Sequence, residues 1–154
     1  MQKRVIGHPT QVSGAAWLDL ESKAVVEITS EDPARPIESA LQLGKEAGWR
    51  AAYPGPQVIR LLFNQPQLIS HVRIKFTERE RQRTQEFVLR WAQDCNRPFE
   101  EIVRQQWNFN PSGSVIETED YAVNLDGVSV LELAITPDIS RRAAVASLTE
   151  WRMA

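Results

Sequence analysis

The chain has 154 residues, enough for one domain with a sizeable core, and its composition of 42% hydrophobic and 25% charged residues is that of an ordinary globular protein. A formal net charge of −2 gives no overall positive field, which makes nucleic acid an unlikely partner and gives no support to an anionic membrane surface. The polar N-terminus has no secretory h-region, and no apolar run approaches the roughly 20 residues of a membrane helix. The single cysteine, Cys95, fits a reducing compartment. We therefore expect one cytoplasmic domain over residues 1–154.

The first part of the chain predicts little regular structure. Residues 1–22 lack clear periodicity and are expected to wrap across the domain, and a strand follows at Val25–Thr29. Two proline-containing turns then lead to a single helical turn at Ile37–Leu41. Pro36 suits the start of this turn because its missing N–H is not needed there.

The stretch Gln57–Phe76 carries the strongest β signal. Apolar and polar residues alternate over Gln57–Phe63 and again over Leu68–Phe76, which is the period of a half-buried strand. The intervening Asn-Gln-Pro-Gln predicts a turn, so we expect the two strands to pair as an antiparallel hairpin.

Five more strands are predicted in the second half of the chain. They cover Phe87–Trp91, Phe99–Trp107, Tyr121–Leu125, Leu131–Ile135 and Ser147–Met153. The middle of Phe99–Trp107 also fits one helical turn, and we prefer a strand because its neighbours are strands. Asp126-Gly127 predicts a tight turn. Eight short strands with one helical turn indicate an all-β protein, an eight-stranded antiparallel β-sandwich or jelly roll.

Strands that run up and down place alternate loops at alternate ends of a sandwich, so the long loops are expected to share one end. These loops cover residues 30–56, 77–84, 108–119 and 137–146. Binding residues commonly lie on loops over a rigid scaffold. Aromatic rings stack on sugars while arginine and asparagine donate hydrogen bonds, so we expect a ligand site at this end. Its candidate residues are Trp49, Arg50, Tyr53, Arg79, Arg81, Asn108 and Phe109. The alternative is that Trp49 and Trp107 are core residues.

Two charged segments have both a structural and a functional interpretation. Residues 78–83 alternate in sign, which fits either a solvated loop or a recognition loop for an acidic partner or phosphate. Glu117, Glu119 and Asp120 fit either solvated acids or oxygen ligands of a hard cation, although they lack the spacing of a calcium loop.

The sequence gives no positive sign of catalysis. His71 lies within an alternating strand, as an exposed residue of a sheet face would, and no zinc-ligand spacing is present. There is no nucleophile elbow and no glycine-rich phosphate loop. Glu100 and Glu101 are adjacent and point to opposite faces of a strand, which does not suit a carboxylate pair. We therefore expect a binding protein and not an enzyme.

Six segments stand in an order typical of a known family. They are DPARPIESAL at 32–41, GWR at 48–50, QVIRLLFNQPQLISHVRIKF at 57–76, RTQEF at 83–87, Tyr-x-Val-x-Leu at 121–125 and SLTEW at 147–151. In this order the chain, over residues 22–154, resembles the galactose-binding-like jelly roll of discoidin and coagulation-factor type C domains. The resemblance implies a non-catalytic module with its ligand at the loop end, and family members bind sugars, phospholipids or proteins.

This resemblance leaves two functions open. Carbohydrate is the commonest ligand of the family, so the first is carbohydrate binding. The second is an intracellular protein–protein interaction subunit or scaffold, because residues 49–52 are also similar to a scaffold domain of DNA single-strand-break repair. The family often holds a structural calcium near the turn after the first strand, with a glutamate from the last strand. Glu150 matches that glutamate, whereas Ser39–Gln42 replaces the usual turn containing Asp-Gly.

Overall fold

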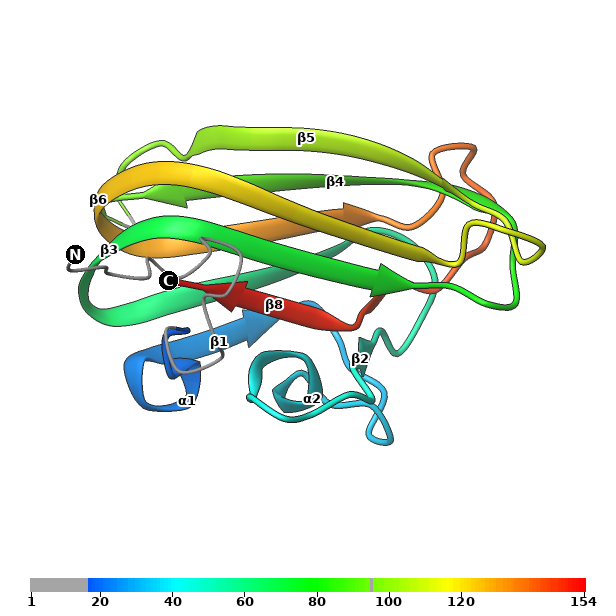
Figure 1. Cartoon of the computed structure of the whole chain (residues 1–154), viewed down its shortest axis with the longest axis horizontal. Helices are drawn as coiled ribbons and strands as arrows, with labels where there is room; N and C mark the ends of the chain where they lie inside the picture. Colours follow the sequence, from blue (N-terminus) through cyan, green and yellow to red (C-terminus); the bar gives the residue numbers. More distant parts are fainter. Residues whose placement is uncertain (1–16, 95) are drawn as a thin grey trace, which may run out of the picture.

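A computed structural model describes residues 17–94 and 96–154 and shows a β-sandwich (Figure 1). Its elements in chain order are α1 (Leu20–Lys23), β1 (Ala24–Ile28), α2 (Glu38–Leu41), β2 (Trp49–Arg50), β3 (Gln57–Thr77), β4 (Arg83–Ala92), β5 (Glu100–Phe109), β6 (Ile116–Thr136), β7 (Ser147–Leu148) and β8 (Glu150–Met153). The prediction of an antiparallel β-sandwich is confirmed, and so is the helical turn now called α2. Most of the predicted N-terminal wrap, and Cys95, lie outside the described residues. None of the described helices has the length and apolar character needed to cross a membrane.

Strands β3 and β6 form one long antiparallel ribbon that belongs to both layers of the sandwich. The first half of β3 pairs with the end of β6, from Gln57 opposite Ile135 to Leu62 opposite Val130. The second half pairs with the start of β6, up to Thr77 opposite Ile116. Both strands bend between these halves, at the left of Figure 1. The ribbon therefore folds over and supplies two neighbouring strands to each layer.

The two predicted hairpin turns are wrong. The residues around Pro66 do not join two paired strands but form the bend of β3, where the pairing register shifts between Leu62 and Gln67. Proline has no N–H for the ladder, so it suits such an irregularity. Gly127 lies in the corresponding bend of β6 with φ of 71°. The period-two pattern identified the buried residues Val72, Ile74 and Phe76 correctly. It was wrong at the bend, where Leu68 is 64% exposed and Ile69 is fully buried because the register shifts there. It contained no information about which strand pairs with which.

The core lies between the layers. One layer has the strand order β1–β3–β6–β4–β5, and β8 adds to the second half of β3 in the other. The rings of Phe76 on β3 and Phe87 on β4 lie 5.3 Å apart between centroids and join the two layers. Other fully buried core residues are Ile59, Leu61, Ile74, Leu89, Leu131, Leu133 and Trp151.

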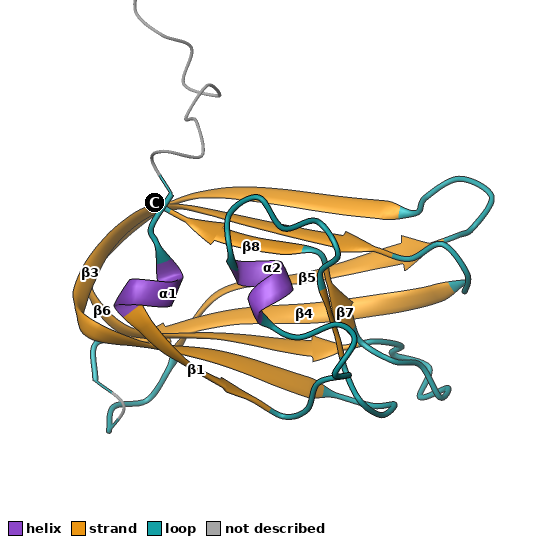
Figure 2. Ribbon diagram, turned by 90° about the horizontal axis from the view of Figure 1, so that it is seen from below, coloured by secondary structure: helices purple, strands orange, loops and turns teal. Residues whose placement is uncertain are grey.

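The remaining elements close the sandwich. The structure confirms that residues 100–109 form a strand, β5, and not a helical turn. The predicted closing strand is divided at Thr149, because β7 pairs with β2 whereas β8 pairs with β3. Figure 2 shows α2 lying beside β8 on the outside of the sandwich. This placement buries one face of α2, through Ala40 and Leu41.

Candidate functional site

A polar cleft of about 1160 Å³ opens at the end of the sandwich where the long loops meet. Its lining comes from residues 35–54, from residues 75–81 at the end of β3 and after it, from Ile116, and from residues 143–150. These segments are far apart in the sequence but meet at the right-hand end of Figure 1. The sequence predicted that the long loops, which contain most of these segments, share one end of the sandwich.

Backbone hydrogen bonds hold the cleft segments together. Trp49 of β2 pairs with Leu148 of β7, and the amide of Ala51 donates to the carbonyl of Ala146 at 2.9 Å. Gly48, just before β2, has φ of 74°, and a Cβ there would lie 2.7 Å from the carbonyl oxygen of Leu148. Only glycine allows this conformation together with such a close approach. Backbone hydrogen bonds between β2 and β7 therefore hold this wall of the cleft in place.

Four of the seven predicted ligand-binding residues line the cleft: Trp49, Arg50, Arg79 and Arg81. Trp49, however, is only 1% exposed, and its indole Nε1 donates to the carbonyl of Ser30 at 3.1 Å. The expectation that this ring stacks on a ligand is therefore wrong for this conformation, and Trp49 supports the cleft from beneath. Tyr53 is 49% exposed and lies next to the lining residue Pro54. It is the aromatic candidate that remains accessible.

The other two candidates, Asn108 and Phe109, do not line the cleft. Phe109 is fully buried, and the guanidinium carbon of Arg83 lies 4.8 Å from the centroid of its ring. The Oδ1 atom of Asn108 accepts a hydrogen bond from the Thr84 hydroxyl at 2.5 Å. The expectation that Phe109 contacts a ligand is wrong, because its ring is needed to pack against Arg83.

Arg83 is a buried residue within what the sequence suggested was a solvated charge run. Its Nε donates to Glu78 at 2.8 Å, and its Nη1 donates to Gln85 and to the carbonyl of Pro137 at 3.0 and 2.8 Å. Arg83 is in phase with Phe87 on the inward face of β4, and this spacing was the signal that could have identified it.

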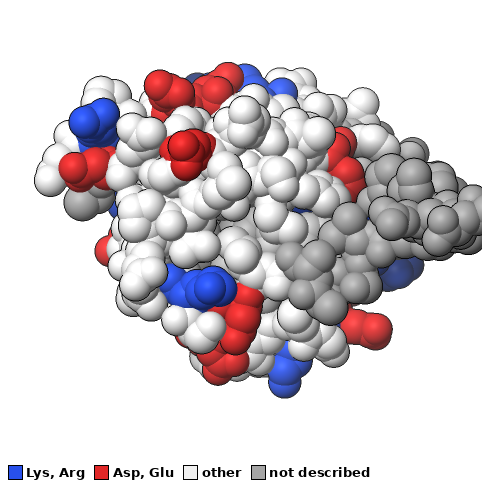
Figure 3. All heavy atoms as spheres, turned by 60° about the vertical axis from the view of Figure 1, so that its left-hand side comes forward, with Lys and Arg blue, Asp and Glu red and all other residues white. Residues whose placement is uncertain are grey.

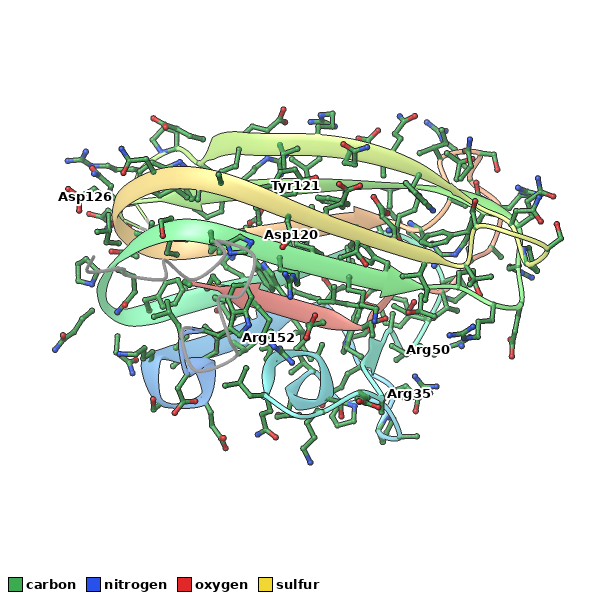
Figure 4. The ribbon with its side chains drawn as sticks, in the orientation of Figure 1. Arg35, Arg50, Asp120, Tyr121, Asp126 and Arg152 are labelled. Atoms are coloured by element: carbon green, nitrogen blue, oxygen red, sulfur yellow. The ribbon has the colours of Figure 1, made fainter. Side chains whose placement is uncertain are left out.

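Charged side chains dominate the cleft, and sequence reasoning identified only half of the basic ones. Six basic and four acidic residues line it: Arg35, Lys45, Arg50, Lys75, Arg79, Arg81, Glu46, Glu78, Glu80 and Glu150. Arg35 and Arg50 lie at the same end of the molecule in Figure 4. Two of the acids are engaged elsewhere, since Glu78 pairs with Arg83 at 2.8 Å and Glu150 with Arg152 at 3.5 Å.

The acidic cluster on β6 does not form a cation site. Glu117 is fully buried, and burial together with a hydrogen bond to Glu119 raises its pKa to about 8. Asp120, in contrast, accepts hydrogen bonds from His71 and Arg73 at 2.9 and 2.8 Å on the outer face. Within residues 17–94 and 96–154 no group of three or more histidine, cysteine or acidic side chains could hold a metal. The alternative of a hard-cation site at these acids is not supported.

The position implied for a structural calcium is instead contacted by an arginine. Arg152 of β8 is 3% exposed, and it donates from Nη1 to the carbonyl of Ala40 at 2.7 Å and from Nη2 to that of Gln42 at 2.9 Å. Figure 4 shows this residue between β8 and α2. Burial lowers the pKa of Arg152, and the nearby Glu150 carboxylate partly offsets that effect. The carbonyls of Ala40 and Gln42 thus accept hydrogen bonds from Arg152, whose guanidinium also pairs with Glu150 at 3.5 Å.

Comparison with solved structures identifies the architecture. The sequence itself matches no protein-family model and no curated protein. A family 32 carbohydrate-binding module from Clostridium perfringens NanJ, solved in complex with galactose, superimposes with a TM-score of 0.60 and 17% identity, covering 89% of this chain and 96% of that module. The fold is the galactose-binding-like jelly roll.

Two further structures share this jelly roll. A chitosan-binding module from a chitosanase/glucanase of Paenibacillus sp. IK-5 has a TM-score of 0.63 and 13% identity, with 89% of this chain and 98% of that module covered. The family 32 module of AlyQ, in complex with 4,5-unsaturated mannuronic acid, has a TM-score of 0.57 and 16% identity, with 86% and 95% covered. The jelly roll of the present chain thus has carbohydrate-binding modules among its structural neighbours.

Proposed function

We propose that this protein is a non-catalytic carbohydrate-binding module that takes its ligand in the cleft at the loop end. The observation that carries the proposal is the cleft itself: about 1160 Å³ in volume, polar, and built from several loops over a rigid jelly roll. Tyr53, which is 49% exposed and precedes the lining residue Pro54 in the sequence, offers a flat surface for a sugar. The neighbouring structures solved with galactose and with unsaturated mannuronic acid support the same class of ligand.

The chemistry of the cleft favours binding over catalysis. Glycoside hydrolysis generally uses a pair of carboxyl groups, one of them as the general acid. Two of the four cleft glutamates, Glu78 and Glu150, are instead paired with arginines. Glu117, whose pKa burial raises to about 8, is fully enclosed and does not line the cleft. These placements speak against Glu78, Glu150 and Glu117 as a catalytic acid or base at the ligand.

The alternative, a protein-docking subunit, has less support. A docking surface needs a continuous apolar patch of several hundred Å². Within residues 17–94 and 96–154, the exposed large hydrophobic residues lie instead on separate strands and loops: Val25, Leu43, Tyr53, Leu68, Ile116 and Ile139. We therefore prefer carbohydrate binding to protein docking as the proposed function.

Affinity electrophoresis in gels that contain soluble polysaccharides of different composition tests the proposal. Retardation by at least one polysaccharide is expected, and Tyr53→Ala should weaken it because the variant removes the accessible ring without touching the core. Leu68→Ala is the matched control, since Leu68 is 64% exposed in the bend of β3 and is not part of the cleft. A protein that no polysaccharide retards, at any pH near neutrality, would contradict the proposal.

A further inference from the structure

The cleft carries more positive charge than the net charge of the protein suggests. Six basic side chains face four acidic ones, and none of the six forms an ion pair with any residue that the structure describes. Glu78 and Glu150, in contrast, are already neutralised by Arg83 and Arg152. Only Glu46 and Glu80 remain to balance the cations of the cleft.

The cations come from two segments that flank β7 and Thr149. Arg35, Lys45 and Arg50 come from β2 and the segment before it, and β2 pairs with β7. Lys75, Arg79 and Arg81 come from the end of β3 and the loop after it, where the amide of Thr149 donates to the carbonyl of Lys75 at 2.8 Å. Two of them are fixed through backbone carbonyls, because Arg35 donates to Ala47 and Arg81 donates to Ala143. A ligand that enters between the two groups meets positive charge on both sides.

The opposite end of the sandwich shows no comparable cluster of basic side chains in the view of Figure 3. Figure 3 shows the side of the molecule that carries the bends of β3 and β6, where much of the surface is uncharged and the basic and acidic side chains are scattered. Like charges gathered without partners repel one another, and they focus the field into a cleft with low-dielectric walls. An anionic ligand relieves that repulsion, whereas a neutral one does not.

We propose, resting on the proposed function, that the ligand is an acidic polysaccharide whose sugar units carry carboxylate groups, bound between the Arg35–Arg50 side and the Arg79–Arg81 side of the cleft. The planar guanidinium of arginine donates paired hydrogen bonds that match a carboxylate. Four of the six cations are arginines. A polymer with one carboxylate on each unit can engage both sides at once, and its hydroxyl groups can use the polar surface between them.

The test compares polymers with matched backbones. Sodium polygalacturonate and its fully methyl-esterified form differ in the charge of the sugar unit but not in its ring, and chitosan carries the opposite charge. Poly-glutamate carries carboxylates without sugars. Isothermal titration with each should give binding to polygalacturonate, weakened as NaCl is raised, and at least tenfold weaker binding to the other three.

Two arginines serve as test variants because neither side chain makes a hydrogen bond or ion pair with any other described residue. Arg50→Gln changes a residue of β2 and Arg79→Gln one of the loop after β3, and each should weaken binding to polygalacturonate about three- to tenfold. Arg97→Gln is the control, since Arg97 is exposed and outside the cleft, and it should leave the affinity within about twofold.

The outcomes separate this inference from the proposed function. Equal affinity for the esterified polymer, or tighter binding to chitosan, would overturn the acidic ligand and leave carbohydrate binding standing. Equal affinity for poly-glutamate would show recognition of charge alone and overturn both. If R50Q and R79Q bind polygalacturonate as tightly as the unmodified protein does, the polymer binds outside this cleft. That result would overturn the inference.

Discussion

The guanidinium of Arg152 donates a hydrogen bond to the backbone carbonyl of Ala40 at 2.7 Å, across 112 residues of sequence. With the second bond to Gln42, it attaches the helical turn α2 to the last strand of the sandwich. A buried arginine of the chain itself thus donates hydrogen bonds to the carbonyl oxygens of the turn where the family resemblance implied a calcium ion. The sandwich is expected to be stable without a metal.

Arg152→Met should destabilise the protein by about 2–4 kcal/mol, because it removes two charge-assisted hydrogen bonds and leaves the buried Ala40 carbonyl without its Arg152 donor. Arg73→Met, at a half-exposed arginine that pairs with Asp120, should cost about 1 kcal/mol or less. Urea denaturation measures both. EDTA should leave the thermal midpoint of the unmodified protein unchanged, and a drop after chelation would show that a metal contributes after all.

Gly48 and Gly44 offer a matched pair of substitutions. Both have positive φ, 74° and 81°, but an added Cβ meets the Leu148 carbonyl oxygen at Gly48 and nothing within 4 Å at Gly44. Gly44→Ala should cost about 1 kcal/mol for the left-handed backbone, and Gly48→Ala about 2–4 kcal/mol because backbone must also move. Equal losses in chemical denaturation would mean that the close approach to β7 contributes nothing.

The free energy of unfolding should fall as the pH rises from about 5 to 8. Glu117 releases its proton near 4.5 when unfolded and near 8 when folded, so the unfolded state binds fewer protons in this interval. Glu117→Gln should remove this loss and stabilise the protein at pH 8 by on the order of a few kcal/mol, with little effect at pH 5.

Glu21→Gln is the control for this pH dependence, since Glu21 is an exposed carboxyl on α1. It should leave the slope between pH 5 and 8 as in the unmodified protein. Asp120, whose pKa is lowered by its bonds to Arg73 and His71 despite partial burial, contributes only at lower pH. A slope in E117Q as steep as in the unmodified protein would contradict the assignment to Glu117.

Phe109 should matter for stability and not for the ligand. Phe109→Leu leaves a cavity in the core and removes the ring beneath the Arg83 guanidinium, which should destabilise the protein by about 1–3 kcal/mol. Its affinity for any polysaccharide that the unmodified protein binds should stay within about twofold at a temperature where the variant is folded. A tenfold loss of affinity would contradict this prediction and indicate that Phe109 contributes to ligand binding.

Alternation of residue types was sufficient to predict the faces of the strands and the sandwich, because burial of one face is a local property. It could not predict pairing: Gln57–Phe63 and Leu68–Phe76 are adjacent in sequence, yet each pairs with β6 and not with the other. The period of two also places Arg152 on the outward face of β8, opposite Trp151. Its burial depends on α2, which covers that face from a distant part of the chain.

The ligand site could also be predicted only in part, because contacts between distant residues are not visible in local sequence patterns. The loop end was predictable from strand order, and so were Arg50, Arg79 and Arg81 as its cations. For Trp49 the sequence left a ligand contact and a core position open, and the structure confirms the core position. The sequence could not decide between them, because the hydrogen bond from the indole to the Ser30 carbonyl joins residues 19 apart. Nor could the sequence show that Glu78 is neutralised by Arg83, which requires the inward turn of a residue within a charge run.

The bent ribbon of β3 and β6 has a consequence for how the chain folds. The pairs around its bends join residues that are 56 to 68 apart in sequence, from Ile69 opposite Leu125 to Leu62 opposite Val130, and loop closure over such distances makes folding slow. Because each layer takes two of its strands from this ribbon, neither layer can assemble first as a native unit. A chain cut at either bend would lose strands from both layers at once, so the sandwich should unfold in a single transition with no half-folded species.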